Sequence, residues 1–243
     1  MAVALLKKFP QSFRHSIRGW KIRIKMKQTA LVIGATGLVG RQLVTQLREN
    51  SAFDVIHLFV RRPSEVDHSK VREHVVDFEK PDEWTHLLRG DVLFACMGTT
   101  IKTAGSQEAQ WRVDHDYPLQ TATRAANNSV KRLVLVSAVG ANAGSRIFYN
   151  RMKGALDEAI SALPFEQVTI LRPSILAGNR TESRPGERIG LALMQVLRFI
   201  PGLRAYRPID VRIVARAMVN SALSNRTERI RIIELDAIFN EAK

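Results

Sequence analysis

The sequence is short of cysteine and of long apolar runs. Its 243 residues contain one cysteine, Cys96, so an internal disulfide is impossible and the composition suits a reducing compartment. Cys96 ends a hydrophobic run, which favours a plain buried thiol. No stretch of about 18 or more apolar residues is present, so no transmembrane helix is predicted. The apolar segment GLALMQVLRFIPGL is interrupted by Arg198 and Pro201 and is typical of a buried or partner-facing helix.

Two other kinds of pattern are absent. The six histidines show no spacing typical of metal ligands, and the sequence lacks H-E-x-x-H, so we expect no bound metal. The sequence also lacks G-x-S-x-G, the motif that carries the nucleophilic serine of many hydrolases. A hydrolase is therefore not predicted.

The formal net charge is +14, which taken alone would favour nucleic-acid binding. Residues 1–25, however, hold seven lysines and arginines and no acidic residue, so half of the excess comes from this one segment. The other basic residues are scattered and interleaved with acids. We therefore predict no specific nucleic-acid partner.

Residues 1–26 form a basic extension ahead of the predicted domain. One interpretation is a disordered tail, and another is a targeting presequence or a segment that lies on a membrane surface. Met26 offers a third, because translation could start there. We expect a cytoplasmic location and leave organelle targeting or membrane-surface association open.

The rest of the chain, residues 27–243, alternates between strand and helix patterns. Runs rich in Val, Ile and Leu separated by amphipathic segments predict a parallel sheet covered by helices on both faces. The predicted class is a doubly wound α/β sheet of the Rossmann type, in one domain with short C-terminal elements on the substrate side. The expected strands are 29–35, 53–60, 71–78, 91–98, 131–141, 166–176 and 229–235; the expected helices are 37–50, 81–88, 106–129, 146–163 and 208–223.

Three glycines, Gly34, Gly37 and Gly40, follow the first predicted strand and open the first helix. The first turn needs a backbone conformation that is costly with a Cβ, the second glycine lets the chain approach a pyrophosphate, and the third lets the helix pack on the sheet. The helix N-terminus then offers free N–H groups to phosphates. We predict a dinucleotide site rather than a purely structural turn, and the loop adds Ala35, Thr36, Leu38 and Val39 to the expected cofactor contacts.

The end of the second strand decides between NAD and NADP. A carboxylate there would bind a ribose 2′-hydroxyl, but the sequence has Arg61 and Arg62, which suit a 2′-phosphate. We predict NADP (NADPH) and keep NAD open, since a pair of arginines is also common on any surface. Asp77 and Phe78 end the third strand and are expected at the adenine, with a simple turn aspartate as the alternative.

Several stretches together resemble one protein family. GATGLVG, the Y-x-x-x-K pattern at Tyr149–Lys153 and LRPS are similar to the short-chain dehydrogenase/reductase superfamily. GTT, VDHDYPLQTA, LVSAVGAN and ESRPGE resemble its atypical branch, the one that includes the Tat-interacting oxidoreductase-like protein. The resemblance covers about residues 28–235. It implies a Rossmann-type NAD(P)-binding fold with a Tyr/Lys/Ser active site.

Carried over from that family, Tyr149, Lys153 and Ser137 are the candidate catalytic residues. Tyr149 and Lys153 are four residues apart, so they share one face of a helix. A free tyrosine is a poor acid near neutral pH, and a neighbouring ammonium group makes its proton easier to transfer. Lys153 and Tyr149 are also expected at the nicotinamide ribose. An exposed helical pair is the alternative, and Ala138 stands where relatives often carry a second serine.

Further contacts follow from the ends of other strands. Gly98, Thr99 and Thr100 follow the fourth strand and are expected to line the cofactor. Asp114 resembles a helical polar position that supports the active site, with a helix-surface aspartate as the alternative. Arg172 and Pro173 follow the sixth strand, where the family's loop covers nicotinamide; a structural ion pair of Arg172 is the alternative. Residues 179–187 are expected to shape the substrate mouth or to form a structural loop.

Two classes of function remain at this point. The first is an NADPH-dependent oxidoreductase that transfers hydride to a small carbonyl substrate. The second is a non-catalytic NADPH-binding regulator or adaptor. Sugar-nucleotide epimerisation is disfavoured because the short C-terminal part leaves little room for a substrate domain. The partners we consider are a small-molecule substrate, a regulatory protein, and a second copy of the chain packed through residues 191–200.

Overall fold

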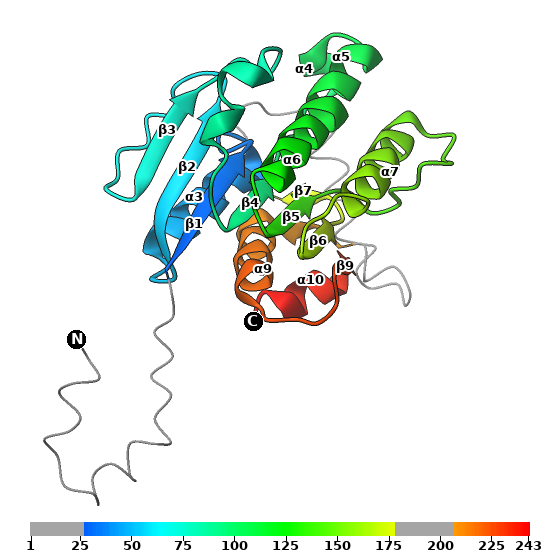
Figure 1. Cartoon of the computed structure of the whole chain (residues 1–243). Helices are drawn as coiled ribbons and strands as arrows, with labels where there is room; N and C mark the ends of the chain where they lie inside the picture. Colours follow the sequence, from blue (N-terminus) through cyan, green and yellow to red (C-terminus); the bar gives the residue numbers. More distant parts are fainter. Residues whose placement is uncertain (1–26, 178–206) are drawn as a thin grey trace, which may run out of the picture.

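Seven parallel strands form the centre of the protein (Figure 1). The computed structural model describes residues 27–177 and 207–243, so the expectations for residues 1–26, 179–187 and 191–200 lie outside the described residues. The strand order is β3-β2-β1-β4-β5-β6-β9. The strands are β1 Gln28–Ile33, β2 Phe53–Val60, β3 Val71–Val75, β4 Val92–Ala95, β5 Arg132–Val136, β6 Gln167–Arg172 and β9 Ile230–Glu234.

The order of the strands reverses between β1 and β4. From β1 the chain runs outward through β2 to β3, then returns to place β4 on the other side of β1 and continues to β5, β6 and β9. Every neighbouring pair is parallel, so all carboxyl ends meet at one edge of the sheet. Ligands of such sheets bind outside the carboxyl ends where the order reverses. The predicted doubly wound Rossmann-type sheet is confirmed.

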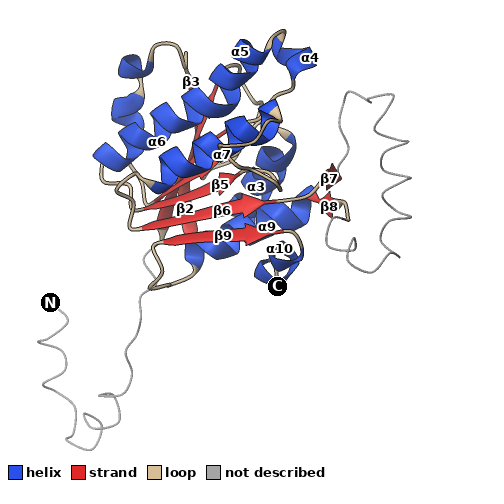
Figure 2. Ribbon diagram, turned by 90° about the vertical axis from the view of Figure 1, so that its right-hand side faces the viewer, coloured by secondary structure: helices blue, strands red, loops and turns tan. Residues whose placement is uncertain are grey.

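Helices cover both faces of the sheet, with α6 and α7 on the face turned upward in Figure 2 and α3 and α9 on the opposite face. Side chains of β1 alternate between two cores: Ala30 and Val32 pack toward α3 and α9, Leu31 and Ile33 toward α6 and α7. Burial on both faces explains why the strands are almost continuously apolar. The helices are α3 Leu38–Glu49, α6 Tyr117–Asn127, α7 Phe148–Ser161, α9 Val211–Leu223 and α10 Asp236–Glu241.

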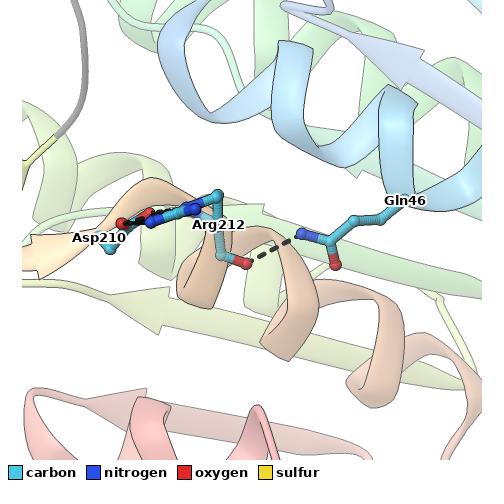
Figure 3. Close-up of polar contacts among 3 residues, drawn as sticks. All are labelled: Gln46, Asp210 and Arg212. Atoms are coloured by element: carbon cyan, nitrogen blue, oxygen red, sulfur yellow. Dashed lines mark hydrogen bonds and ion pairs between the residues drawn. The ribbon is translucent and has the colours of Figure 1, made fainter.

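A polar contact joins α3 to α9, far apart in the sequence. Gln46 on α3 donates from Nε2 to the carbonyl oxygen of Arg212 at 2.9 Å (Figure 3). Asp210 caps α9 by accepting from the N–H of Arg212 at 2.8 Å, and its carboxylate also pairs with the Arg212 guanidinium. This pairing holds the pKa of Asp210 below its usual value. The first turn of α9 is thereby fixed against α3.

Two expected helices differ in the structure. The expectation of a helix at 81–88 is wrong: the segment forms two short 3₁₀ turns, η3 Pro81–Glu83 and η4 Thr85–Leu87. Between them Trp84 is buried, and its Nε1 donates to the carbonyl oxygen of Asp77 at 2.9 Å. The buried Trp84 side chain separates the two short turns, so the segment does not continue as one regular helix. The long helix expected at 106–129 is present as α5 Gln107–Trp111, the π-helical turn η5 Arg112–Asp116 and α6.

The remaining elements lie near the carboxyl edge. The short helix α4 Ile101–Ala104 follows β4 and is capped by the Thr100 side chain. A two-residue parallel pair, β7 Leu176–Ala177 and β8 Ile209–Asp210, lies on either side of the undescribed segment 178–206. Among the helices of the described ranges, none has the length and apolar character needed to span a bilayer.

Gly154 allows α7 to touch the loop that follows β5. A Cβ at Gly154 would lie 2.2 Å from the backbone of Asn142 and of Ala143. In an ordinary helix Gly→Ala stabilises by about 1 kcal/mol, but overpacking costs roughly 1–3 kcal/mol. We expect Gly154→Ala to lower the free energy of unfolding, measured by urea denaturation. Gly144→Ala is the control, because its nearest atom would be 3.4 Å away; equal stability of both variants would contradict the contact.

Candidate cofactor and catalytic site

The glycine loop connects β1 to α3 at the point where the strand order reverses. Gly34 has φ +77°, and a Cβ there would lie 2.5 Å from the backbone of Cys96 on the β4 side. The turn is closed by the Gly37 N–H, which donates to the Gly34 carbonyl oxygen at 3.0 Å. Gly34 therefore needs both its backbone conformation and its lack of a side chain.

The third glycine has a different role from the one expected. A Cβ at Gly40 would lie 2.1 Å from the carbonyl oxygen of Gly34 and 2.9 Å from Cα of Ala35. Gly40 thus lets α3 pack against the loop itself rather than against the sheet. Gly37 is the N-cap of α3 without a side-chain cap bond, and the first turn of the helix holds no acidic residue. This leaves the helix N-terminus suited to an anion.

A cleft of about 1000 Å³ opens beside the loop. Ala35 and Thr36 of the glycine loop line it, and so do both predicted specificity residues, Arg61 and Arg62. Leu38 and Val39, by contrast, pack against the core with their side chains. The sequence prediction missed two further arginines in the lining, Arg41 and Arg48. They are seven residues apart, so a helical projection of α3 would have placed them on one face.

Asp77 and Phe78 follow β3, and the contacts of both side chains are structural. Phe78 is buried, with its ring centroid 5.2 Å from Trp84 and 5.4 Å from Tyr117. Asp77 Oδ1 accepts from the Glu79 N–H at 3.0 Å, as in the turn that was considered as the alternative. Glu79 in turn accepts from the Tyr117 hydroxyl at 2.5 Å. The adenine contact expected for Asp77 and Phe78 stays a prediction.

The loop after β4 is fastened to η5. The Thr99 N–H donates to Asp114 Oδ1 at 2.7 Å, and Gln110 Nε2 donates to the Thr99 carbonyl oxygen at 3.3 Å. Thr100 is the N-cap of α4, and Gly98 is exposed. The loop follows the carboxyl end of β4, and the cofactor contact expected for Gly98, Thr99 and Thr100 stays a prediction.

The Y-x-x-x-K pair lies on the first half of α7. Tyr149 is 40% exposed, whereas Lys153 is 3% exposed and its Nζ lies 3.9 Å from Asp114 Oδ2. Asp114 is itself 1% exposed, so the alternative of a helix-surface aspartate is wrong. Burial raises the pKa of Asp114, and Lys153, Thr99 and Gln110 oppose that rise. One residue of the pair faces outward, and the other is held by a buried carboxylate.

Ser137 follows β5 immediately and is 5% exposed. Its N–H donates to the Leu171 carbonyl oxygen at 2.8 Å, which keeps it in register with β6. Its Oγ is buried and has no hydrogen-bond partner among the described residues. Ala138, where relatives often carry a second serine, is half-buried.

Arg172 and Pro173 join the ends of three strands. Arg172 Nε donates to Asp157 Oδ2 on α7 at 2.8 Å, and one of its terminal nitrogens donates to Glu234 on β9 at 2.8 Å. The Pro173 carbonyl oxygen accepts from the Val139 N–H at 3.0 Å. The Arg172 side chain is thus engaged in the structural ion pairs considered as the alternative, and its cofactor role stays a prediction. Asp157 was missed by sequence reasoning, although it lies one helical turn past Lys153.

These parts define a class of protein: a Rossmann-type dinucleotide-binding fold with a Y-x-x-x-K helix at the same edge as the glycine loop. The model of the family described as NAD(P)H-binding matches residues 34–190. The protein FMP52, mitochondrial, of Eremothecium gossypii is 33% identical over 225 residues, covering 88% of this chain and 97% of that protein. HTATIP2 of Rattus norvegicus is 32% identical over 220 residues, covering 89% and 90%.

The chain therefore belongs to the NAD(P)H-binding family of atypical short-chain dehydrogenase/reductase proteins, as the sequence motifs predicted. Solved structures share the fold. A short-chain dehydrogenase/reductase superfamily protein from Agrobacterium tumefaciens with bound NAD superposes with a TM-score of 0.64 at 16% identity, covering 85% of this chain and 77% of that one. MoeE5 in complex with UDP-glucose and NAD gives 0.63 at 19% identity, covering 85% and 75%. Two of the fungal relatives, from Eremothecium gossypii and Aspergillus fumigatus, are named as mitochondrial proteins. For this chain, a targeting role of residues 1–26 stays a prediction.

Cys96, the one cysteine of the sequence, directly follows β4; its backbone lies against Gly34, and the residue as a whole is half-buried. Burial raises the pKa of its thiol to about 12, and its Sγ lies 3.9 Å from Met218 Sδ. Because thiolate is the reactive form, we expect negligible alkylation by iodoacetamide in the native protein at pH 8. Full labelling in urea, followed by mass spectrometry, is the control. Rapid labelling of the folded protein would contradict a buried thiol.

Proposed function

We propose that this protein is an NADPH-dependent oxidoreductase that reduces a small carbonyl substrate with Tyr149, Lys153 and Ser137. The observation that carries the proposal is that the predicted cofactor-binding and catalytic residues lie at the same carboxyl edge of the sheet. The glycine loop, the arginine-lined cleft, Ser137 and the first turns of α7 all follow carboxyl ends of adjacent parallel strands. When bound, NADPH supplies the hydride.

The residues present fit a dinucleotide phosphate. The N-terminus of α3 lacks both a side-chain cap and a nearby acid, so its N–H groups remain for a pyrophosphate. The adjoining cleft is lined by four arginines against one acidic residue, Glu65. Guanidinium groups form charge-assisted, two-pronged bonds to phosphate. This supports a 2′-phosphate contact by Arg61 and Arg62, and hence NADP over NAD.

The acid–base assignment rests on exposure and charge. Tyr149 presents its side chain to solvent, where it can reach a substrate oxygen and donate a proton. Lys153 lies one turn further along α7, and its ammonium group is retained in the interior by Asp114. That ion pair fixes the position of the charge that stabilises a phenolate. Ser137 is at the end of β5 with a free hydroxyl oxygen.

The cofactor preference is tested by Arg61→Gln and Arg62→Gln. Hydrogen bonds to charged groups contribute about 1.5–3 kcal/mol, so each variant should weaken NADPH binding by roughly 10- to 100-fold. NADH, which lacks the 2′-phosphate, should bind equally to all proteins. Binding is followed by quenching of intrinsic Trp fluorescence. Arg89→Gln is the control, since Arg89 is exposed and precedes β4 at the opposite edge. A wild type that prefers NADH would overturn the assignment.

The catalytic assignment is tested by Tyr149→Phe. Removing the hydroxyl should reduce NADPH oxidation over a panel of aldehydes and ketones by about 10²- to 10⁴-fold, the range of a lost general acid. The Kd for NADPH should hardly change, since the ring remains. Equal rates in both proteins would refute the role of Tyr149. Tight NADPH binding by a wild type that reduces no carbonyl would favour the non-catalytic regulator instead.

A further inference from the structure

The loop between β2 and β3 carries both arginines proposed to bind the 2′-phosphate. Arg61 and Arg62 are exposed on it, and Ser64 lines the arginine cleft together with them. Exposed side chains on a loop take their place from the backbone that carries them and from the scaffold that holds this backbone. Whatever fastens the loop to the sheet therefore decides whether the two guanidinium groups meet a phosphate.

Glu73 on the edge strand β3 holds this loop. Its Oε2 accepts from the Ser64 N–H at 3.0 Å and also from the Ser64 hydroxyl. Glu73 pairs in register with Leu58 of β2, which packs in the core toward α3, so Glu73 lies on the α3 face of the sheet, as the cleft does. Hydrogen bonds to a carboxylate are stronger than those to a neutral acceptor. One half-buried acid thus ties the loop to the sheet through two bonds.

The backbone that follows Ser64 is also held. Glu65 has φ +58°, in the left-handed region that costs free energy for a residue with a Cβ. Such a conformation persists where the surrounding contacts fix it. On one side of Glu65 are the bonds from Ser64 to Glu73, and on the other side Val66 packs against the core. The loop is therefore fixed on the sheet two residues after Arg62.

The same bonds limit what Ser64 can offer a ligand. A serine hydroxyl has one proton to donate, and Glu73 accepts it, so this proton is not available to a phosphate. Glu73 is itself an anion next to a residue of the cleft, and by charge alone it repels a phosphate. Direct binding of the phosphate by this pair is therefore unfavourable, and holding the loop is the task that suits its chemistry.

We propose that Glu73 is a positioning residue that sets the preference for NADPH over NADH by holding, through Ser64, the loop that carries Arg61 and Arg62. The proposal rests on the proposed NADPH-dependent function. NADPH and NADH differ only in the 2′-phosphate, so only NADPH binding depends on where the two guanidinium groups lie. Released from Glu73, the loop takes up other positions, and the arginines meet the phosphate in only a fraction of them.

Glu73→Ala tests positioning against charge. Loss of the bonds should weaken NADPH binding by about five- to tenfold, the value of one hydrogen bond, while the Kd for NADH stays unchanged. Glu73→Gln is the matched control, because it removes the same charge but keeps an oxygen that accepts from Ser64; it should bind NADPH at least as tightly as wild type. Equal tightening of NADPH binding in both variants, or an equal loss for NADPH and NADH in Glu73→Ala, overturns the proposal.

A measurement on the cofactor-free protein separates this proposal from the proposed function. Hydrogen exchange of the Ser64 N–H, followed by NMR, reports its bond to Glu73. Exchange should be faster in Glu73→Ala than in wild type and unchanged in Glu73→Gln. Equal exchange in all three proteins overturns the proposal. If exchange accelerates as expected but wild type binds NADPH no more tightly than NADH, the proposed cofactor fails and the attachment of the loop to Glu73 stands.

Discussion

The contact between Gly34 and the backbone of Cys96 is the constraint on which the rest of the site depends. Strands β1 and β4 are hydrogen-bonded neighbours. After β1 the chain continues to β2 on one side of this pair, and after β4 it continues to β5 on the other side. The turn after β1 crosses the end of β4 so closely that a Cβ would lie 2.5 Å from the Cys96 carbonyl carbon. With glycine there, the turn leads directly into α3, and its N-terminus points at the crevice where the sheet diverges.

Buried charge organises the other half of the site. The two buried carboxylates near α7 each face a cation: Asp114 lies 3.9 Å from Lys153, and Asp157 lies 2.8 Å from Arg172. Removing one partner of a buried pair leaves an uncompensated charge at a cost of about 3–5 kcal/mol. These pairs tie α7 to η5 on one side and to β6 on the other. The same bonds that hold the helix in place also set the charge around the proposed catalytic residues.

Much of this architecture could be predicted from local patterns, and the exceptions have physical causes. Nearly continuous runs of Val, Ile and Leu located the seven strands, because burial on both faces constrains every residue of a parallel strand. The helix expected at 81–88 failed because Trp84 must enter the core, a tertiary demand that no helical periodicity records. The motif Y-x-x-x-K located Tyr149 and Lys153 on one helix, but which of them is buried depends on Asp114, whose place in η5 follows from packing alone.

Asp157 shows what kind of residue such patterns miss. An acid four residues after Lys153 in the sequence is typical of an exposed helical ion pair. The fold instead turns this face of α7 inward, against the end of β6, where Arg172 Nε donates to Asp157 Oδ2 at 2.8 Å. Asp114, Ser137 and Asp157 each hold a buried side-chain oxygen without a hydrogen-bond partner among the described residues. Each costs free energy while it is unpaired in the interior, and no sequence pattern marks it, because the cost depends on which neighbours the fold brings close.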